Sequence, residues 1–130
     1  MECAPGPSCT GDESEEAVGA WPAARGNRDR IFIGTKGGAR PTVPGDRTLD
    51  SAEGLSAAAV ARAAEGSLCR LRTDYVDPYW SHIEDRSAPL HETLGAPNTL
   101  AEQGKVRALG ASNIAAWRLE RARNLSGAPA

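Results

Sequence analysis

The chain has 130 residues and a formal net charge of −2, which suits one modest domain. This near-balance gives no electrostatic basis for binding nucleic acid or an anionic membrane, and no apolar run approaches the roughly 20 residues that span a bilayer. The chain has three cysteines, Cys3, Cys9 and Cys69, and this odd number predicts no disulfide framework. We see no secretory leader, which predicts a cytoplasmic protein. The cysteines and the two histidines do not have the spacing of metal ligands, so no metal site is expected.

The N-terminal half is predicted to contain one helix and one strand. Residues 1–12 show no periodicity, so we expect a loop or a disordered end there. A short helix is predicted over residues 14–21 and should end at Pro22, which cannot continue its hydrogen bonding. Residues 31–35 read as a buried strand. Residues 37–47 follow as a long loop rich in glycine and proline.

The C-terminal half is predicted to alternate helices and strands. The second helix should be capped by Asp50 or Ser51, and Pro97 should kink or split the third helix. The predicted elements in chain order are a helix to Leu71, a turn over Arg72–Asp74, a strand over Tyr75–Ser81, a loop over Glu84–Ser87, a helix over Pro89–Gln103, a strand over Val106–Ala111 and a helix over Ile114–Leu125.

This alternation is typical of βαβ units and a parallel sheet. The C-terminal ends of parallel strands open onto one face, where the chemistry of such folds takes place. Each predicted strand is followed closely by polar side chains: Lys36 after the first, His82 after the second, and Ser112 with Asn113 after the third. We therefore expect these residues on one rim. No Gly-x-Gly-x-x-Gly follows a strand, which disfavours a dinucleotide-binding Rossmann fold.

Each of these residues also has an ordinary structural explanation. Lys36 alone would be a solvated lysine, and His82 alone a hydrogen-bonded structural histidine. Ser112 and Asn113 are good N-caps for the helix that follows them. Trp80 would either line a pocket or, as aromatic residues on buried strands more often do, belong to the core.

Four segments carry a more specific pattern. They read Ser-Glu-Glu-Ala-Val-Gly at 14–19, a strand ending in Thr-Lys at 31–36, Ser-Leu-Cys-Arg-Leu-Arg-Thr-Asp-Tyr-Val-Asp at 67–77, and Gly-Lys-Val-Arg-Ala-Leu-Gly-Ala-Ser-Asn at 104–113. The third segment leads directly to His82. In order and spacing, the four resemble those of the aldo-keto reductase family. The resemblance covers nearly everything after residue 13.

The resemblance implies an α/β fold, namely a partial (β/α)8 TIM barrel with parallel strands and about three βα units visible. Residues 13–126 would form this partial NADP-dependent oxidoreductase domain, between a loop over 1–12 and a tail over 127–130. The family reduces aldehydes and ketones to alcohols with NADPH as cofactor. A small carbonyl compound would therefore be the substrate, with no nucleic acid and no membrane as partner.

The resemblance also assigns roles to the residues on the rim. Lys36 and His82 would be catalytic, the lysine assisting a tyrosine that supplies a proton and the histidine orienting the carbonyl group of the substrate. Ser112 and Asn113 would bind the nicotinamide carboxamide of the cofactor, and no metal would take part. Hydroxyl and amide side chains suit the donor and acceptor ends of a carboxamide.

The sequence departs from the family pattern just before the first helix. The family places an aspartate and a tyrosine there, whereas residues 3–11 contain neither, and Asp12 lies too close to the helix. Tyr75 and Tyr79 fall within the second strand, and Tyr79 lies about 10 Å of strand rise before His82. We therefore expect impaired activity in this chain.

Two alternatives remain open at this point. The chain would be a non-catalytic barrel remnant that acts as an interaction or oligomerising module and self-associates through its open sheet edges. A barrel enzyme that acts on sugars or phosphates is a more distant alternative, because a fold does not by itself fix the chemistry.

Overall fold

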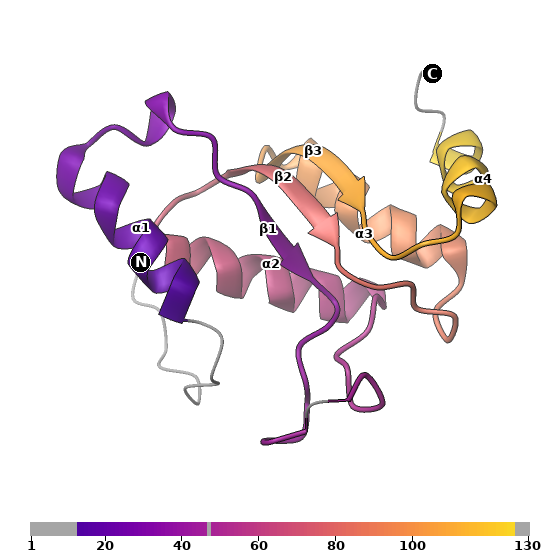
Figure 1. Cartoon of the computed structure of the whole chain (residues 1–130). Coiled ribbons are helices and arrows are strands. Elements are labelled where there is room, and N and C mark those ends of the chain that lie inside the picture. The colour runs from indigo at the N-terminus through magenta and orange to yellow at the C-terminus, as the bar shows by residue number, and fades with distance from the viewer. Residues whose placement is uncertain (1–12, 47, 127–130) are drawn as a thin grey trace.

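Parallel strands alternate with α-helices along the chain in the computed structural model, which describes residues 13–46 and 48–126 (Figure 1). The elements are α1 (Glu13–Arg25), the short 3-10 helix η1 (Arg28–Arg30), β1 (Thr35–Gly37), α2 (Ala57–Leu71), β2 (Val76–Ser81), α3 (Leu90–Glu102), β3 (Val106–Ala111) and α4 (Ala116–Ser126). The strands form one sheet in the order β1-β2-β3. This arrangement confirms the predicted α/β class with parallel strands. The predictions for residues 1–12 and 127–130 lie outside the described residues.

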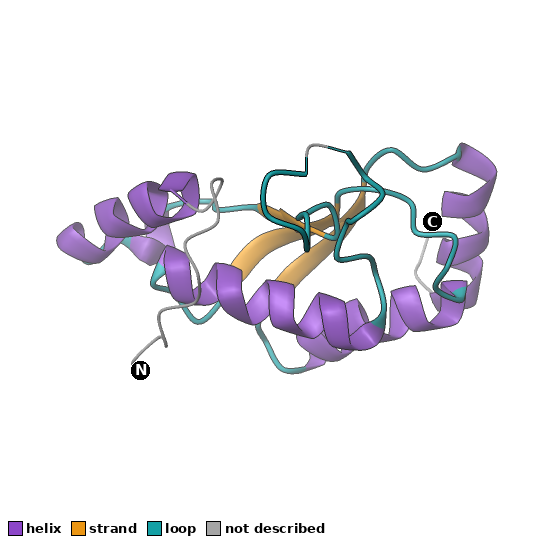
Figure 2. Ribbon diagram, turned by 90° about the horizontal axis from the view of Figure 1, so that it is seen from below, coloured by secondary structure: helices purple, strands orange, loops and turns teal. Residues whose placement is uncertain are grey.

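The hydrophobic core lies between the sheet and the helices α2 and α3 (Figure 2). From α2 it receives a stripe of apolar side chains spaced three or four residues apart, which is the spacing of one helical face. The buried members of this core are Ile33, Leu55, Val60, Ala64, Leu68, Leu71, Val76, Tyr79, Leu100 and Val106. The helix α1 packs beside α2 and extends the helical layer.

The helix α2 begins later than the sequence predicted. Ser56 caps it by accepting a hydrogen bond from the backbone N–H of Ala59 at 3.3 Å. The predicted caps were wrong because Ser51 accepts the backbone N–H of Thr42 and belongs to a loop pairing instead. At the other end, Arg72 adopts a left-handed conformation with φ of 53° and ends the helix.

Two prolines lie inside helices without ending or splitting them. The helix α1 continues through Pro22 to Arg25, and Gly26, with φ of 60°, ends it. The helix α3 is continuous across Pro97, so the predicted split is wrong. A proline inside a helix loses one backbone hydrogen bond, which is why helix propensity disfavours it. Both prolines are buried here, and the packing of their side chains offsets that loss.

The first strand also differs from its prediction. It covers Thr35–Gly37, whereas Ile31, Phe32 and Ile33 run beside β2 without regular pairing. Phe32 is 77% exposed, so the prediction of a fully buried strand was wrong for this residue. A side chain accounts for the later start of β1, because the backbone N–H of Ile33 donates at 2.8 Å to a carboxylate oxygen of Asp77 and not to the backbone of β2.

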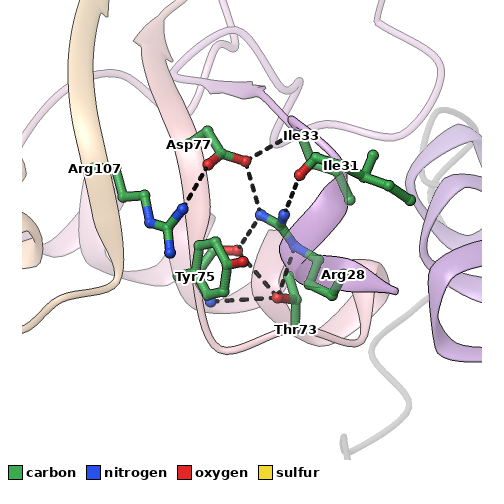
Figure 3. A network of polar contacts seen from close by, with 7 residues as sticks. All are labelled: Arg28, Ile31, Ile33, Thr73, Tyr75, Asp77 and Arg107. Atoms are coloured by element: carbon green, nitrogen blue, oxygen red, sulfur yellow. Dashed lines mark hydrogen bonds and ion pairs between the residues drawn. The ribbon is translucent and has the colours of Figure 1, made fainter. Parts of the chain in front are cut away.

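Asp77 is the centre of a polar network at the start of the strands (Figure 3). It is 4% exposed and forms ion pairs with Arg28 at 3.0 Å and with Arg107 of β3 at 3.3 Å. The two guanidinium groups also lie over the ring of Tyr75, each 4.0 Å from its centroid. One carboxylate therefore connects the segment before β1 with β2 and β3.

The pKa of Asp77 reflects opposing influences. Burial alone would raise it, but the N–H of Ile33, the hydrogen bond and charge of Arg28 and the charge of Arg107 together bring it below the usual value of 3.8. A lowered pKa in the folded state means that the ionised carboxylate stabilises the fold above pH 3.8. This stability is lost as the pH falls through the folded-state pKa.

One cysteine departs from expectation. The sequence predicted no disulfide framework, yet Cys69 in α2 is disulfide-bonded. The prediction is wrong for Cys69, because an odd number of cysteines excludes the pairing of all three but not of two.

Replacement of Asp77 by asparagine is expected to destabilise the protein by about 2–3 kcal/mol at pH 7, because Arg28 would lose its charged partner in a largely buried position. Urea unfolding at pH 7 and at a pH below the folded-state pKa of Asp77 measures this. The difference between wild type and variant should shrink at the lower pH, where Asp77 becomes protonated.

The matched control is Asp74→Asn, since Asp74 is exposed and lies three residues earlier. This variant should unfold at nearly the same urea concentration as wild type. Equal losses in the two variants would show that general surface charge, and not the network around Asp77, accounts for the effect.

Candidate functional site

The C-terminal ends of the three strands lie side by side at one edge of the sheet (Figure 1). Their register places Lys36 of β1 next to Trp80 of β2, and Trp80 next to Gly110 of β3. His82 comes directly after β2, and Ser112 directly after β3. The structure thus puts the predicted site residues at the same edge.

The backbone of His82 is held on one side by β1 and on the other by the turn that follows β3. Its N–H donates to the carbonyl oxygen of Gly37 in β1 at 2.9 Å. Its own carbonyl oxygen accepts the side-chain amide Nδ2 of Asn113 at 2.8 Å. The residue is nevertheless exposed. A fixed backbone with an accessible imidazole is suited to contact with a bound molecule.

Ser112 and Asn113 form the turn between β3 and α4. Asn113 has a φ of 54°, a left-handed conformation in which asparagine costs less than most residues. Its Nδ2 also lies 3.1 Å from Ser112 Oγ, and the N–H of Ser112 donates to Ser81 at 2.8 Å. The alternative role as N-caps is not observed, because α4 begins only at Ala116.

Lys36 is not joined to the other three residues by a hydrogen bond or ion pair within the described part of the chain. It is exposed on β1 and adjacent in register to Trp80. Trp80 is 38% exposed, which excludes it from the core. Its indole covers Gly110 so closely that a Cβ atom there would lie 2.3 Å from the ring.

Neither tyrosine presents its hydroxyl group at this rim. Tyr79 is 1% exposed, and its oxygen would lie 2.0 Å from a Cβ atom at Gly37. Burial, followed by the charges of Glu53 and Glu15, raises the pKa of Tyr79 above its ordinary value. Tyr75 lies between two arginines at the opposite end of β2. Both are therefore poor proton donors for chemistry at His82.

A contact that the sequence did not predict joins two loops beside the rim, the loop before α2 and the loop after β2. Asp85 accepts the backbone N–H of Leu55 at 2.8 Å and the hydroxyl of Ser87 at 2.6 Å. The hydrogen bond from Ser87, opposed by burial and reinforced by backbone N–H groups, lowers the pKa of Asp85. The Asp-Arg-Ser spacing is a local turn signal that indicates the contact with Ser87, but not the distant one with Leu55.

These loops enclose a cavity of about 580 Å³ beside Asn113. Several carboxylates line it, namely those of Asp50, Glu53, Glu84, Asp85 and Glu92. Within residues 13–46 and 48–126, no group of three or more His, Cys, Asp or Glu side chains could hold a metal ion.

Comparison with known proteins identifies the fold and its lineage. Residues 11–130 match the model of the aldo/keto reductase family. The norsolorinic acid reductase StcV of Emericella nidulans is 34% identical over 108 residues, which cover 82% of this chain. The NADP(+) aryl-alcohol dehydrogenase of Phanerodontia chrysosporium is 32% identical over 120 residues, or 87% of the chain.

A solved structure agrees with these relatives. A thermostable aldo-keto reductase in complex with the inhibitor epalrestat superimposes with a TM-score of 0.71 and 31% identity, over 86% of this chain and 36% of that one. The sheet and its helices therefore correspond to part of a (β/α)8 barrel, which confirms the predicted partial barrel. The chain spans only 28% and 30% of the length of the two curated relatives.

Substitutions at Asn113 separate its hydrogen bond from its backbone conformation. Asn113→Gly should lose about 1 kcal/mol, because the bond to the His82 carbonyl disappears while φ remains allowed. Asn113→Ala should lose about 2 kcal/mol, because the left-handed conformation adds its own cost. Urea unfolding of the three proteins measures the order. A glycine variant as stable as wild type would contradict the importance of the bond.

Proposed function

Since the chain belongs to the aldo/keto reductase family, we propose that it carries part of the site of an NADPH-dependent oxidoreductase that reduces aldehydes or ketones to alcohols. One observation carries this proposal: His82, Ser112 and Asn113 are linked by hydrogen bonds at the rim to which Lys36 also belongs. The family assignment favours this function over the alternative of a non-catalytic interaction module.

The donor and acceptor groups of the rim fit a nicotinamide carboxamide. Both hydrogens of Asn113 Nδ2 are directed to groups of the protein, at His82 and Ser112. The amide oxygen of Asn113 can therefore accept from the carboxamide nitrogen. A hydroxyl that accepts one hydrogen bond can still donate its own hydrogen, so Ser112 can serve the carboxamide oxygen. The NADP(+) named for a relative supports this choice of cofactor.

Lys36 and His82 would act on the carbonyl substrate. NADPH supplies the hydride when it is bound. An imidazole N–H of His82 can donate a hydrogen bond to the carbonyl oxygen, where negative charge grows during reduction, and so stabilise that charge. Lys36 adds a positive charge at the same rim, which favours the same developing anion.

We also propose that this chain turns over little substrate by itself. The family tyrosine and aspartate have no counterparts in the sequence before α1. The buried hydroxyl of Tyr79 and the arginine-flanked ring of Tyr75 do not replace them. Proton donation to the alkoxide would then depend on water or on a group outside this chain.

The strands β1 and β3 each have one neighbour in the described sheet, so self-association would proceed through their free edges. Within the described part of the chain, no helix is both long and apolar enough to cross a membrane. Cytoplasmic localisation and the domain limits of 13 and 126 stay predictions.

NADPH binding is expected to perturb the backbone NMR signals of Ser112, Asn113 and His82 in the whole chain. The signals of Arg28 and Tyr75, at the opposite end of the sheet, should stay in place. Asn113→Ala should weaken binding about tenfold, because one well-placed polar contact is worth about 1.4 kcal/mol. Asn124→Ala, an exposed amide on α4, is the matched control and should bind like wild type. A uniform response along the chain would count against this site.

Carbonyl-dependent NADPH oxidation by the purified chain should be at or near background, and Lys36→Met and His82→Gln should leave it there. A longer protein that contains the same segment together with a tyrosine donor should be active, and each substitution should reduce its kcat at least a hundredfold. Robust turnover by this chain, abolished by Lys36→Met, would contradict the proposed impairment.

A further inference from the structure

The loop that follows His82 contains a charged side chain that points inward. The side chain of Glu84 is only 13% exposed, and it forms an ion pair with Arg118 of α4, whose side chain is 21% exposed. The two groups are in ionic contact without the alignment of a hydrogen bond. The pair joins the loop after β2 to the helix after β3. Each charge requires the other, since removal of one would leave a largely buried charge unpaired.

A second partner of Glu84 contributes much less. Arg86 approaches the same carboxylate at 3.4 Å, but its side chain is 76% exposed. Ion pairs of exposed side chains are screened by water and contribute little. The position of Glu84 is therefore set mainly by Arg118.

The ion pair lies at the wall of an apolar cavity. The cavity has a volume of about 220 Å³ and lies between the ends of β2 and β3 and the helices α3 and α4. Glu84 and Arg118 both line it, as do Ile83, Leu109 and Ile114. An unpaired carboxylate would avoid such surroundings and move toward water. The loop would move with it, and that loop begins at His82.

We propose that Arg118, acting through Glu84, is a positioning residue for His82. The ion pair fixes the direction in which the chain leaves β2, and so holds the peptide of His82 between Gly37 and Asn113. The inference rests on the proposed role of His82 in catalysis. In the described structure, α4 forms no hydrogen bond or ion pair with Lys36 or His82. The inference gives this helix a part in the geometry of the site.

Residue-resolved amide hydrogen exchange on the whole chain tests the proposal. In Arg118→Leu, the amide of His82, which donates to Gly37, should exchange at least tenfold faster than in wild type. The amide of Asp77, which donates to Ile33 in the segment before β1, should be unchanged. The imidazole NMR signal of His82 should shift toward that of free histidine, and the signal of His91 on α3 should stay in place.

Two further variants test whether the ion pair between Glu84 and Arg118 causes the change at His82. The exchange of charges in Glu84→Arg with Arg118→Glu should restore slow exchange at His82, because the ion pair is formed again. Glu120→Gln is the matched control on the same helix, where Glu120 faces Arg123 at 3.4 Å in an exposed pair. This variant should leave His82 unaffected.

Each remaining outcome is decisive. Equal acceleration of the His82 and Asp77 amides would overturn the proposal, because it would show a loss of overall stability alone. An unchanged His82 amide would overturn it as well. Should Arg118→Leu fail to fold, Glu84→Gln gives the same comparison with nearly the same shape. Since no cofactor is used, a failure of NADPH binding would contradict the proposed function without affecting this result.

Discussion

The arrangement of the sheet depends on one buried carboxylate. Asp77 of β2 accepts the backbone N–H of Ile33, which regular strand pairing does not engage, and it pairs with Arg28 and Arg107. A carboxylate buried to this extent is tolerated only when several donors share its charge. These donors come from the segment before β1 and from β3, so the same carboxylate links all three strands at their beginnings, most firmly the segment before β1 to β2 because the side chain of Arg107 is exposed. The register that brings Lys36 beside Trp80 follows from it.

The sequence predicted much of the fold, because the periodic segments are strongly patterned. The strand β3 was predicted with its observed limits, and the strand β2 within one residue. The errors arose where a distant contact overrides a local preference. Pro22 and Pro97 lie inside helices since both are buried. The strand β1 is displaced because a side chain of β2 replaces its first pairing, and no local pattern contains that information.

The candidate site was predictable in part for a different reason. Residue types and their places after each strand indicated His82, Ser112 and Asn113, and the structure connects them. The sequence pattern could not predict the direction in which each of these side chains points. That Asn113 uses its amide hydrogens on a backbone carbonyl and on Ser112 depends on a left-handed turn, which sequence alone leaves open. The inward turn of Glu84 is likewise a tertiary feature, because a charged loop residue is ordinarily solvated.

The close contact between Trp80 and Gly110 has a consequence for how this rim can change over evolution. The indole occupies the space that any side chain at position 110 would need. A large aromatic residue at position 80 is compatible only with glycine at position 110. Glycine can therefore be replaced only after a smaller residue has been substituted at position 80. The two positions are therefore expected to covary among relatives, with the order of substitution determined by steric exclusion.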